Sequence, residues 1–193
     1  MQVDRSVIIL AAGHSSRMGK PKFSLELSDG RTFLEHIVDQ YFSFGCKSII
    51  LVLNEEVSKH LETININKQT NIQCVINSHP EFERYYSIKV GLSVLGNDNY
   101  VFIHNADNPY ANQNILKELY NHRSEADYIK PIYKGRGGHP ILISPLVVKD
   151  INSIENYNIR FNDFLKKYTA KEISTDDNKI LVNINTIFDY SKL

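Results

Sequence analysis

The chain has 193 residues, a length that fits one domain with a substantial core, and we expect residues 1–193 to form a single domain. Its 22 basic and 22 acidic residues give no net charge, which argues against a general binding surface for nucleic acid or an anionic membrane. The cysteines, Cys46 and Cys74, lack metal-ligand spacing and fit a reducing compartment. Neither a signal peptide nor an apolar run of about 20 residues is evident, so we expect a cytoplasmic protein.

The first half of the chain alternates between strands and amphipathic helices. Short apolar, β-branched runs at residues 7–10 and 48–53 predict buried strands of a parallel sheet, and residues 72–76 predict a third strand. Apolar residues at helical spacing predict helices over residues 33–45 and 57–64. This alternation is typical of right-handed crossovers between parallel strands.

The second half adds further elements of both kinds, with no repeat or linker between them. A helix carries Tyr85, Ile88, Leu92 and Leu95 on one face. The other predicted elements are strands at residues 100–104, 128–133 and 141–143, helices at 114–123, 144–151 and 158–168, and a final strand from residue 180 that becomes a terminal segment by residue 190. The predicted fold class is α/β: a Rossmann-like three-layer α/β/α sandwich with a mostly parallel sheet.

The loop after the first strand, residues 10–22, reads L-A-A-G-H-S-S-R-M-G-K-P-K and has the composition of a phosphate-binding loop. It leaves the carboxyl edge of its strand, where ligands bind in open α/β sheets. Small residues at 11–13 allow close approach of the main chain to a ligand, and cations follow them. The alternative, a basic loop that only connects a strand to a helix, stays open. The motifs G-x-x-x-x-G-K-S/T and G-x-G-x-x-G are absent, which argues against a dehydrogenase.

Asp107 follows the strand at residues 100–104, in the sequence H-N-A-D-N-P-Y. Magnesium is held by one or two carboxylates together with substrate phosphates, so a single aspartate that faces the phosphate loop is sufficient to start a site. Asp107 is therefore a candidate Mg²⁺ ligand. The alternative is that its carboxylate caps the following helix.

The order of residues in the loop resembles the signature L-A-A-G-x-S-x-R-M-G-x-x-K of the nucleotidyltransferases related to the molybdenum cofactor enzymes, the MobA/MocA-like family. The matching positions are Leu10, Ala11, Ala12, Gly13, Ser15, Arg17, Met18, Gly19 and Lys22. This resemblance implies that residues 1–193 form a single nucleotidyltransferase domain with a GT-A-like fold. It also implies a nucleotide site that includes Ser16.

Four later segments extend the resemblance. Ser87 and Gly91 match a serine and a glycine on the helix whose serine side tends to face the base, and Asp107 matches the family's motif aspartate. The sequence R-G-G-H-P resembles an R-G-H-P element of the cytidylyltransferase subgroup and makes Arg136 and His139 candidate acceptor-binding residues. Asn183 and Asn185 stand where acids are usual, and they are either metal ligands or solvated polar residues on an edge strand.

The resemblance implies the reaction: transfer of a nucleoside monophosphate from a nucleoside triphosphate to a phosphorylated acceptor, with release of pyrophosphate. Arg17 and the loop backbone would hold the β- and γ-phosphates, Lys22 the α-phosphate and Asp107 a Mg²⁺ ion. Ala12 favours CTP, and the G-G-H-P element favours a molybdopterin-type acceptor and hence a client molybdoenzyme. Phosphocholine or a sugar phosphate as acceptor, and a nucleotide-binding protein that has lost catalysis, remain alternatives.

Overall fold

The computed structural model describes residues 5–13, 22–59 and 72–193. Its centre is one sheet with the strand order β3-β2-β1-β4-β7-β5-β6, and β8 pairs with β5. The strands are β1 (Arg5–Leu10), β2 (Ser48–Leu53), β3 (Ile72–Ile76), β4 (Tyr100–Asn105), β5 (Tyr128–Tyr133), β6 (Arg136–Gly137), β7 (Ile141–Ile143) and β8 (Ala170–Ser174). Strands β3, β2, β1 and β4 are parallel, whereas β7 runs antiparallel to both β4 and β5. The mostly parallel sheet that the alternating pattern predicts is thus present.

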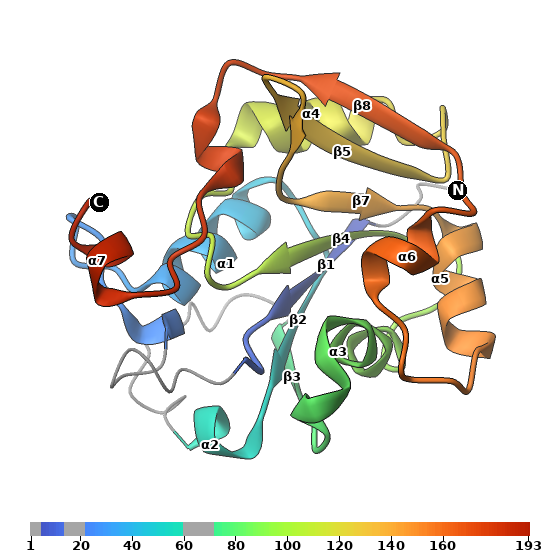
Figure 1. The fold of residues 1–193 in the computed structure, drawn as a ribbon, viewed down its shortest axis with the longest axis horizontal. Helices are drawn as coiled ribbons and strands as arrows, with labels where there is room; N and C mark the ends of the chain where they lie inside the picture. The colour runs from blue at the N-terminus through green and yellow to red at the C-terminus, as the bar shows by residue number, and fades with distance from the viewer. Residues whose placement is uncertain (1–4, 14–21, 60–71) are drawn as a thin grey trace.

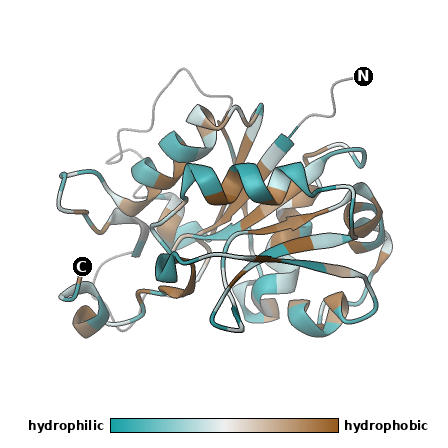
Figure 2. Cartoon of the chain, turned by 90° about the horizontal axis from the view of Figure 1, so that it is seen from above, coloured by the Kyte–Doolittle hydropathy of each residue, from teal (hydrophilic) through white to brown (hydrophobic). Residues whose placement is uncertain are grey.

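Helices cover both faces of the sheet (Figure 1). One face packs against α1 (Phe33–Ser43) and α4 (Gln113–Asn121), and the other against α3 (Glu83–Leu92), α5 (Pro145–Ser153) and α6 (Phe161–Leu165). Each face thus has its own hydrophobic core, the first beneath α1 and α4 and the second beneath α3, α5 and α6. Because side chains alternate along a strand, Val7 and Ile9 of β1 enter the first core and Ile8 enters the second. Figure 2 shows the apolar strands enclosed between helices whose outward faces are polar. The three-layer α/β/α sandwich is confirmed.

Helix α1 illustrates how the sequence fixes an element. Its N-cap Thr32 accepts a hydrogen bond from the Glu35 N–H, and the Glu35 carboxylate accepts one from the Thr32 N–H. This capping box satisfies backbone donors that have no partner inside the helix. The buried residues that follow keep helical spacing and end with Tyr41.

The final strand predicted from residue 180 is wrong. The chain forms a short 3-10 helix, η4 (Asn178–Leu181), and later α7 (Ile187–Tyr190). The apolar residues of this segment are buried without a strand ladder: Ile180 joins the first core and Ile184 packs with Leu25 and Phe33. The segment is held by loop contacts instead, because the Ile184 N–H donates to the Asp107 carbonyl at 2.8 Å.

Other boundaries differ from the predictions. The strand β8 is an edge strand whose residues alternate between exposed and half-buried, and its sequence A-K-E-I-S carries no apolar run to mark it. The predicted helix 158–168 is shorter, as α6, and of the predicted helix 57–64 the structure describes α2 (Glu55–Ser58). No helix in the described part of the chain is long and apolar enough to cross a membrane.

Candidate active site

A cavity of about 240 Å³ lies at the carboxyl ends of β1 and β4. Both strands point towards the side of the molecule where the C-terminal segment with α7 lies (Figure 1). The cavity is lined by Leu10, Ala11, Ala12, Gly13, Lys22, Pro80, Arg84, Ser87, Asn105, Ala106 and Asp107. The fold therefore brings the start of the phosphate-binding loop, Lys22, Ser87 and Asp107 together around this one cavity.

The first wall of the cavity is the backbone of residues 11–13. The Ala11 N–H donates to the Val52 carbonyl at 2.8 Å, and Asn54 Nδ2 donates to the Ala12 carbonyl at 3.0 Å. A Cβ added to Gly13 would meet none of the described residues within 4 Å, so this glycine is not required for packing against them. The remaining predicted residues of this loop, Ser15, Ser16 and Arg17, lie outside the described residues.

Asp107 forms the opposite wall, two residues after β4 ends. It is not the helix cap considered from the sequence, since Asn112 caps α4 and accepts from the Asn114 N–H at 2.8 Å. Its Oδ1 atom is buried and has no hydrogen-bond partner among the described residues. Burial raises the pKa of Asp107, while the positive charges of Lys22 and Arg84 act in the opposite direction.

A buried network holds the Asp107 loop in place. His104 Nε2 lies 2.8 Å from the Asn108 carbonyl, which can only accept, so Nε2 carries the proton. His104 Nδ1 then accepts from the Tyr41 hydroxyl at 3.0 Å. Burial lowers the pKa of His104 to about 4, so the imidazole is neutral near pH 7.

The C-terminal segment contacts the lining residue Lys22 through Asn185. Lys22 Nζ donates to Asn185 Oδ1 at 2.5 Å, which joins two positions 163 residues apart in the sequence. Both Asn183 and Asn185 are exposed. Of the predicted metal set, Asp107 offers a buried oxygen without a described partner, whereas the Asn185 oxygen faces a lysine.

The residues that line the cavity fit a divalent cation that takes most of its ligands from the substrate phosphates. Oxygen ligands suit Mg²⁺, and the buried Asp107 Oδ1 is a carboxylate oxygen of this kind. Within the described ranges, no group of three or more His, Cys, Asp or Glu side chains is placed to hold a metal ion. The protein's own share in such a site would therefore be Asp107, with the phosphates of the nucleotide as the other ligands.

Helix α3 supplies a third wall, in which Ser87 and Gly91 have different roles. Ser87 lines the cavity, and its hydroxyl accepts from Asn77 Nδ2 at 2.9 Å. Gly91 is not among the residues that line it. A Cβ on Gly91 would come within 2.7 Å of Ile8 Cγ2 and 3.0 Å of Val52 Cγ2, so this glycine allows the helix to pack closely on β1 and β2.

Neither of the two predicted acceptor-binding residues is among the residues that line the cavity. Arg136 is exposed on the short strand β6 and does not line the cavity. His139 is half-buried and does not line the cavity either, but its Nε2 lies 3.5 Å from Nδ2 of the lining residue Asn105. Burial, with smaller effects of Arg84 and His104, lowers the pKa of His139 to about 3, so it is neutral near pH 7.

Arg84 is a lining residue that the sequence analysis missed. It lies one helical turn before Ser87 on α3, in E-R-Y-Y-S. The i, i+3 spacing to Ser87 was the available signal, because residues three apart share a helix face.

A cavity at the carboxyl edge of an α/β sheet, with a small-residue loop, a lysine and a buried carboxylate, defines a nucleotide-binding α/β protein. The model of the MobA-like NTP transferase domain matches residues 7–171, and the chain belongs to this family. The molybdenum cofactor cytidylyltransferase of Escherichia coli (strain K12) is 28% identical over 184 residues, which cover 95% of this chain and 92% of that protein.

Three further comparisons agree with this assignment. A 2-C-methyl-D-erythritol 4-phosphate cytidylyltransferase of Photobacterium profundum is 27% identical over 117 residues, which cover 59% of this chain and 48% of that protein. The crystal structure of Rv0371c from Mycobacterium tuberculosis H37Rv has a TM-score of 0.82 and 21% identity, with 98% of this chain and 97% of that chain covered. Its complex with manganese has a TM-score of 0.78 and 18% identity, with 100% and 98% covered. The predicted family and fold class are confirmed, and the chain is a nucleotidyltransferase of this family.

Proposed function

We propose that this protein transfers a nucleoside monophosphate, preferably CMP, from a nucleoside triphosphate to a phosphorylated small molecule and releases pyrophosphate. A molybdopterin-type acceptor is favoured, with a client molybdoenzyme downstream, a cytoplasmic location and Mg²⁺ as the cation. The proposal extends to residues 1–193 as one catalytic domain. The observation that carries it is the cavity in which the loop backbone at residues 10–13, Lys22 and Asp107 face one another. The relatives named above support cytidylyl transfer.

The proposed reaction is an in-line displacement at phosphorus. A phosphate oxygen of the acceptor forms a bond to the α-phosphorus, and the bond from that phosphorus to the oxygen bridging the β-phosphate breaks. The electron pair leaves with pyrophosphate. No general base is needed, because a phosphate monoester is already ionised near neutral pH.

The residues of the chain act by binding and orientation. The backbone N–H groups of residues 12 and 13 and the side chain of Ser87 position the nucleotide, and Lys22 neutralises charge at the α-phosphate. We assign Arg17, Ser15 and Ser16 to the β- and γ-phosphates and His139 with Arg136 to the acceptor. Asp107 would hold the divalent cation, with Asn183 and Asn185 as further candidates, and the bound cation would offset phosphate charge.

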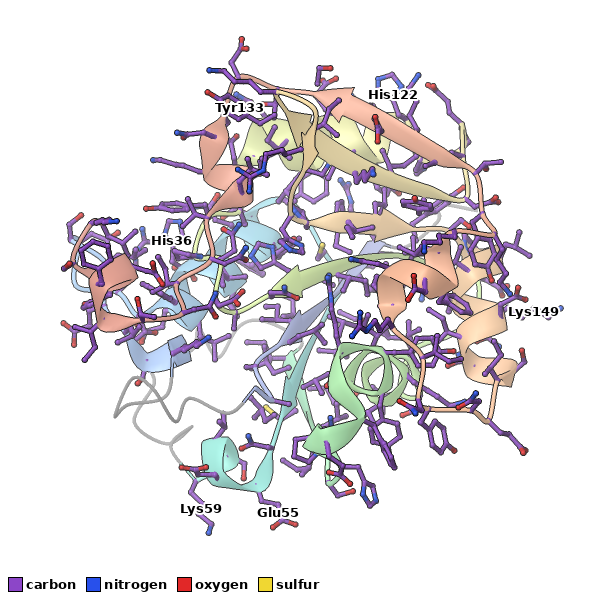
Figure 3. The ribbon with its side chains drawn as sticks, in the orientation of Figure 1. His36, Glu55, Lys59, His122, Tyr133 and Lys149 are labelled. Carbon is purple, nitrogen blue, oxygen red and sulfur yellow. The ribbon has the colours of Figure 1, made fainter. Side chains whose placement is uncertain are left out.

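The test measures pyrophosphate release with CTP, GTP, ATP and UTP against a panel of acceptors. The panel contains molybdopterin, phosphocholine and sugar phosphates, each with Mg²⁺ and with excess chelator. We expect turnover with CTP and one acceptor class that stops when the chelator is present. Lys149→Met is the control variant, because Lys149 projects outward from α5 on the far side from α7 (Figure 3). Nucleotide binding without turnover for every acceptor would support the alternative of a protein that has lost catalysis.

A further inference from the structure

Arg84 is a buried cation at the cavity, and two of its guanidinium donors have no hydrogen-bond partner among the described residues. It lines the cavity together with Ser87 and Asp107, and its Nε and Nη2 atoms are buried without hydrogen-bond partners among the described residues. A guanidinium that leaves donors unpaired in the interior is costly, and an anion that reaches the site relieves this cost.

The unpaired atoms are the two that form one edge of the guanidinium. This Nε and Nη2 edge is the fork that binds a carboxylate or a phosphate through parallel N–H donors. The same edge is filled elsewhere in the molecule: Arg31 donates from Nε at 2.9 Å and from Nη2 at 2.5 Å to the Asp29 carboxylate. Arg84 therefore presents a recognition edge that no described carboxylate occupies.

The surroundings keep Arg84 charged and hold it in place. Its guanidinium lies over the Phe161 ring, with Cζ 5.2 Å from the centroid. Burial lowers the pKa of Arg84 to about 10, while Asp107 acts in the opposite direction, so the side chain remains a cation near pH 7. An anion in this poorly hydrated position would interact with it more strongly than in water.

We propose that Arg84 binds a phosphate group in the cavity, as a contact additional to Lys22 and the loop at residues 10–13. This inference rests on the proposed function, since phosphates are the anions that the reaction brings there. The phosphate is either the α-phosphate of the nucleotide or the phosphate of the acceptor, and both present the oxygen pair that a guanidinium fork binds.

The test compares Arg84→Gln and Arg84→Lys with wild type and with Arg5→Gln. Arg5 is the matched control, because it also stacks on aromatic rings, 4.7 Å from the Phe44 centroid and 4.8 Å from that of Tyr120, at the opposite end of β1. We measure KM for the triphosphate and for the acceptor separately, and the affinity for pyrophosphate and inorganic phosphate by calorimetry.

We expect Arg84→Gln to weaken binding of one phosphorylated ligand by about 10- to 100-fold, the effect of losing a charge-assisted bidentate contact. A rise in KM for the triphosphate identifies the α-phosphate, and a rise confined to the acceptor identifies the acceptor phosphate. In Arg84→Lys, burial would lower the lysine pKa, so phosphate binding should weaken as the pH rises towards 9 in this variant and not in wild type.

Unchanged KM values and unchanged anion affinities in both folded variants would overturn the inference. Failure of the proposed function gives a different result, namely wild-type protein that turns over no acceptor. In that case, weaker binding of pyrophosphate or phosphate by Arg84→Gln still supports the Arg84 site. Thermal unfolding of each variant ensures that folded protein is compared.

Discussion

At the residue scale, Asp107 carries the strongest conflict between stability and function. Its carboxylate is buried beside the cavity with Oδ1 unpaired among the described residues, and burial raises its pKa. A raised carboxyl pKa means that ionisation opposes folding near pH 7 when no cation is bound. This is the pattern expected of a residue retained for its ligand.

We predict that Asp107→Asn lowers turnover at least about 100-fold, because the cation at the phosphates loses its protein ligand. The same substitution should raise the stability of the ligand-free protein, since a neutral amide replaces a buried carboxylate. Pyrophosphate release and urea unfolding at pH 7.5 measure the two effects. Asp98→Asn, at an exposed position before β4, should change neither. Normal turnover in Asp107→Asn would remove the metal assignment.

The sequence was sufficient to predict the residues that directly follow parallel strands. Leu10 to Gly13 and Asp107 line the cavity because the carboxyl ends of neighbouring parallel strands meet at one edge. Arg84 was missed because an arginine between a glutamate and a tyrosine in a helix resembles a surface residue. Its burial depends on Phe161, which the sequence alone does not bring near.

At the element scale, the turn between β6 and β7 is fixed by a close contact with η4. A Cβ on Gly138 would lie 2.6 Å from the Ile180 carbonyl oxygen, and the His139 N–H donates to that same oxygen at 2.9 Å. This contact with η4 fixes the position of His139 beside Asn105. It also fixes the start of the segment that runs from η4 to Ile184, whose N–H donates to the Asp107 carbonyl. The sequence predicted the turn but not this partner, because residues 180–190 resemble a strand.

We predict that Gly138→Ala lowers the free energy of unfolding by about 1 to 3 kcal/mol, the usual cost of overpacking against backbone. Turnover should fall as well, because the turn and η4 must separate. Gly137→Ala is the matched control, since its Cβ would meet Lys130 Cδ at 3.5 Å, an ordinary contact with a flexible side chain. Equal stabilities for the two variants would contradict the argument.

At the scale of the whole molecule, acid sensitivity follows from the buried histidines around the site. Burial lowers the pKa of His104 to about 4 and of His139 to about 3, from an ordinary value of 6.5. The charge of Arg84 acts on both histidines in the same direction. Below pH 6.5 these two histidines bind protons in the unfolded chain but stay neutral in the folded protein. Their contribution to stability is therefore complete above about pH 6.5 and is lost as the pH falls towards 4.

We predict that the free energy of unfolding falls between pH 6.5 and pH 5 by about 1 to 3 kcal/mol per pH unit, the slope for one to two protons. The raised pKa of Asp107 offsets part of this loss, because the folded protein binds that proton first. Urea unfolding at intervals of 0.5 pH unit, a step that we choose, measures how the free energy of unfolding changes with pH. The range lies above the pH at which most carboxylates titrate. His104→Asn should start from a lower stability, because it loses the contact with Tyr41, and should show a shallower slope. A wild-type stability that is flat over this range, or an unchanged slope in His104→Asn, would show that the buried imidazole does not control the acid response.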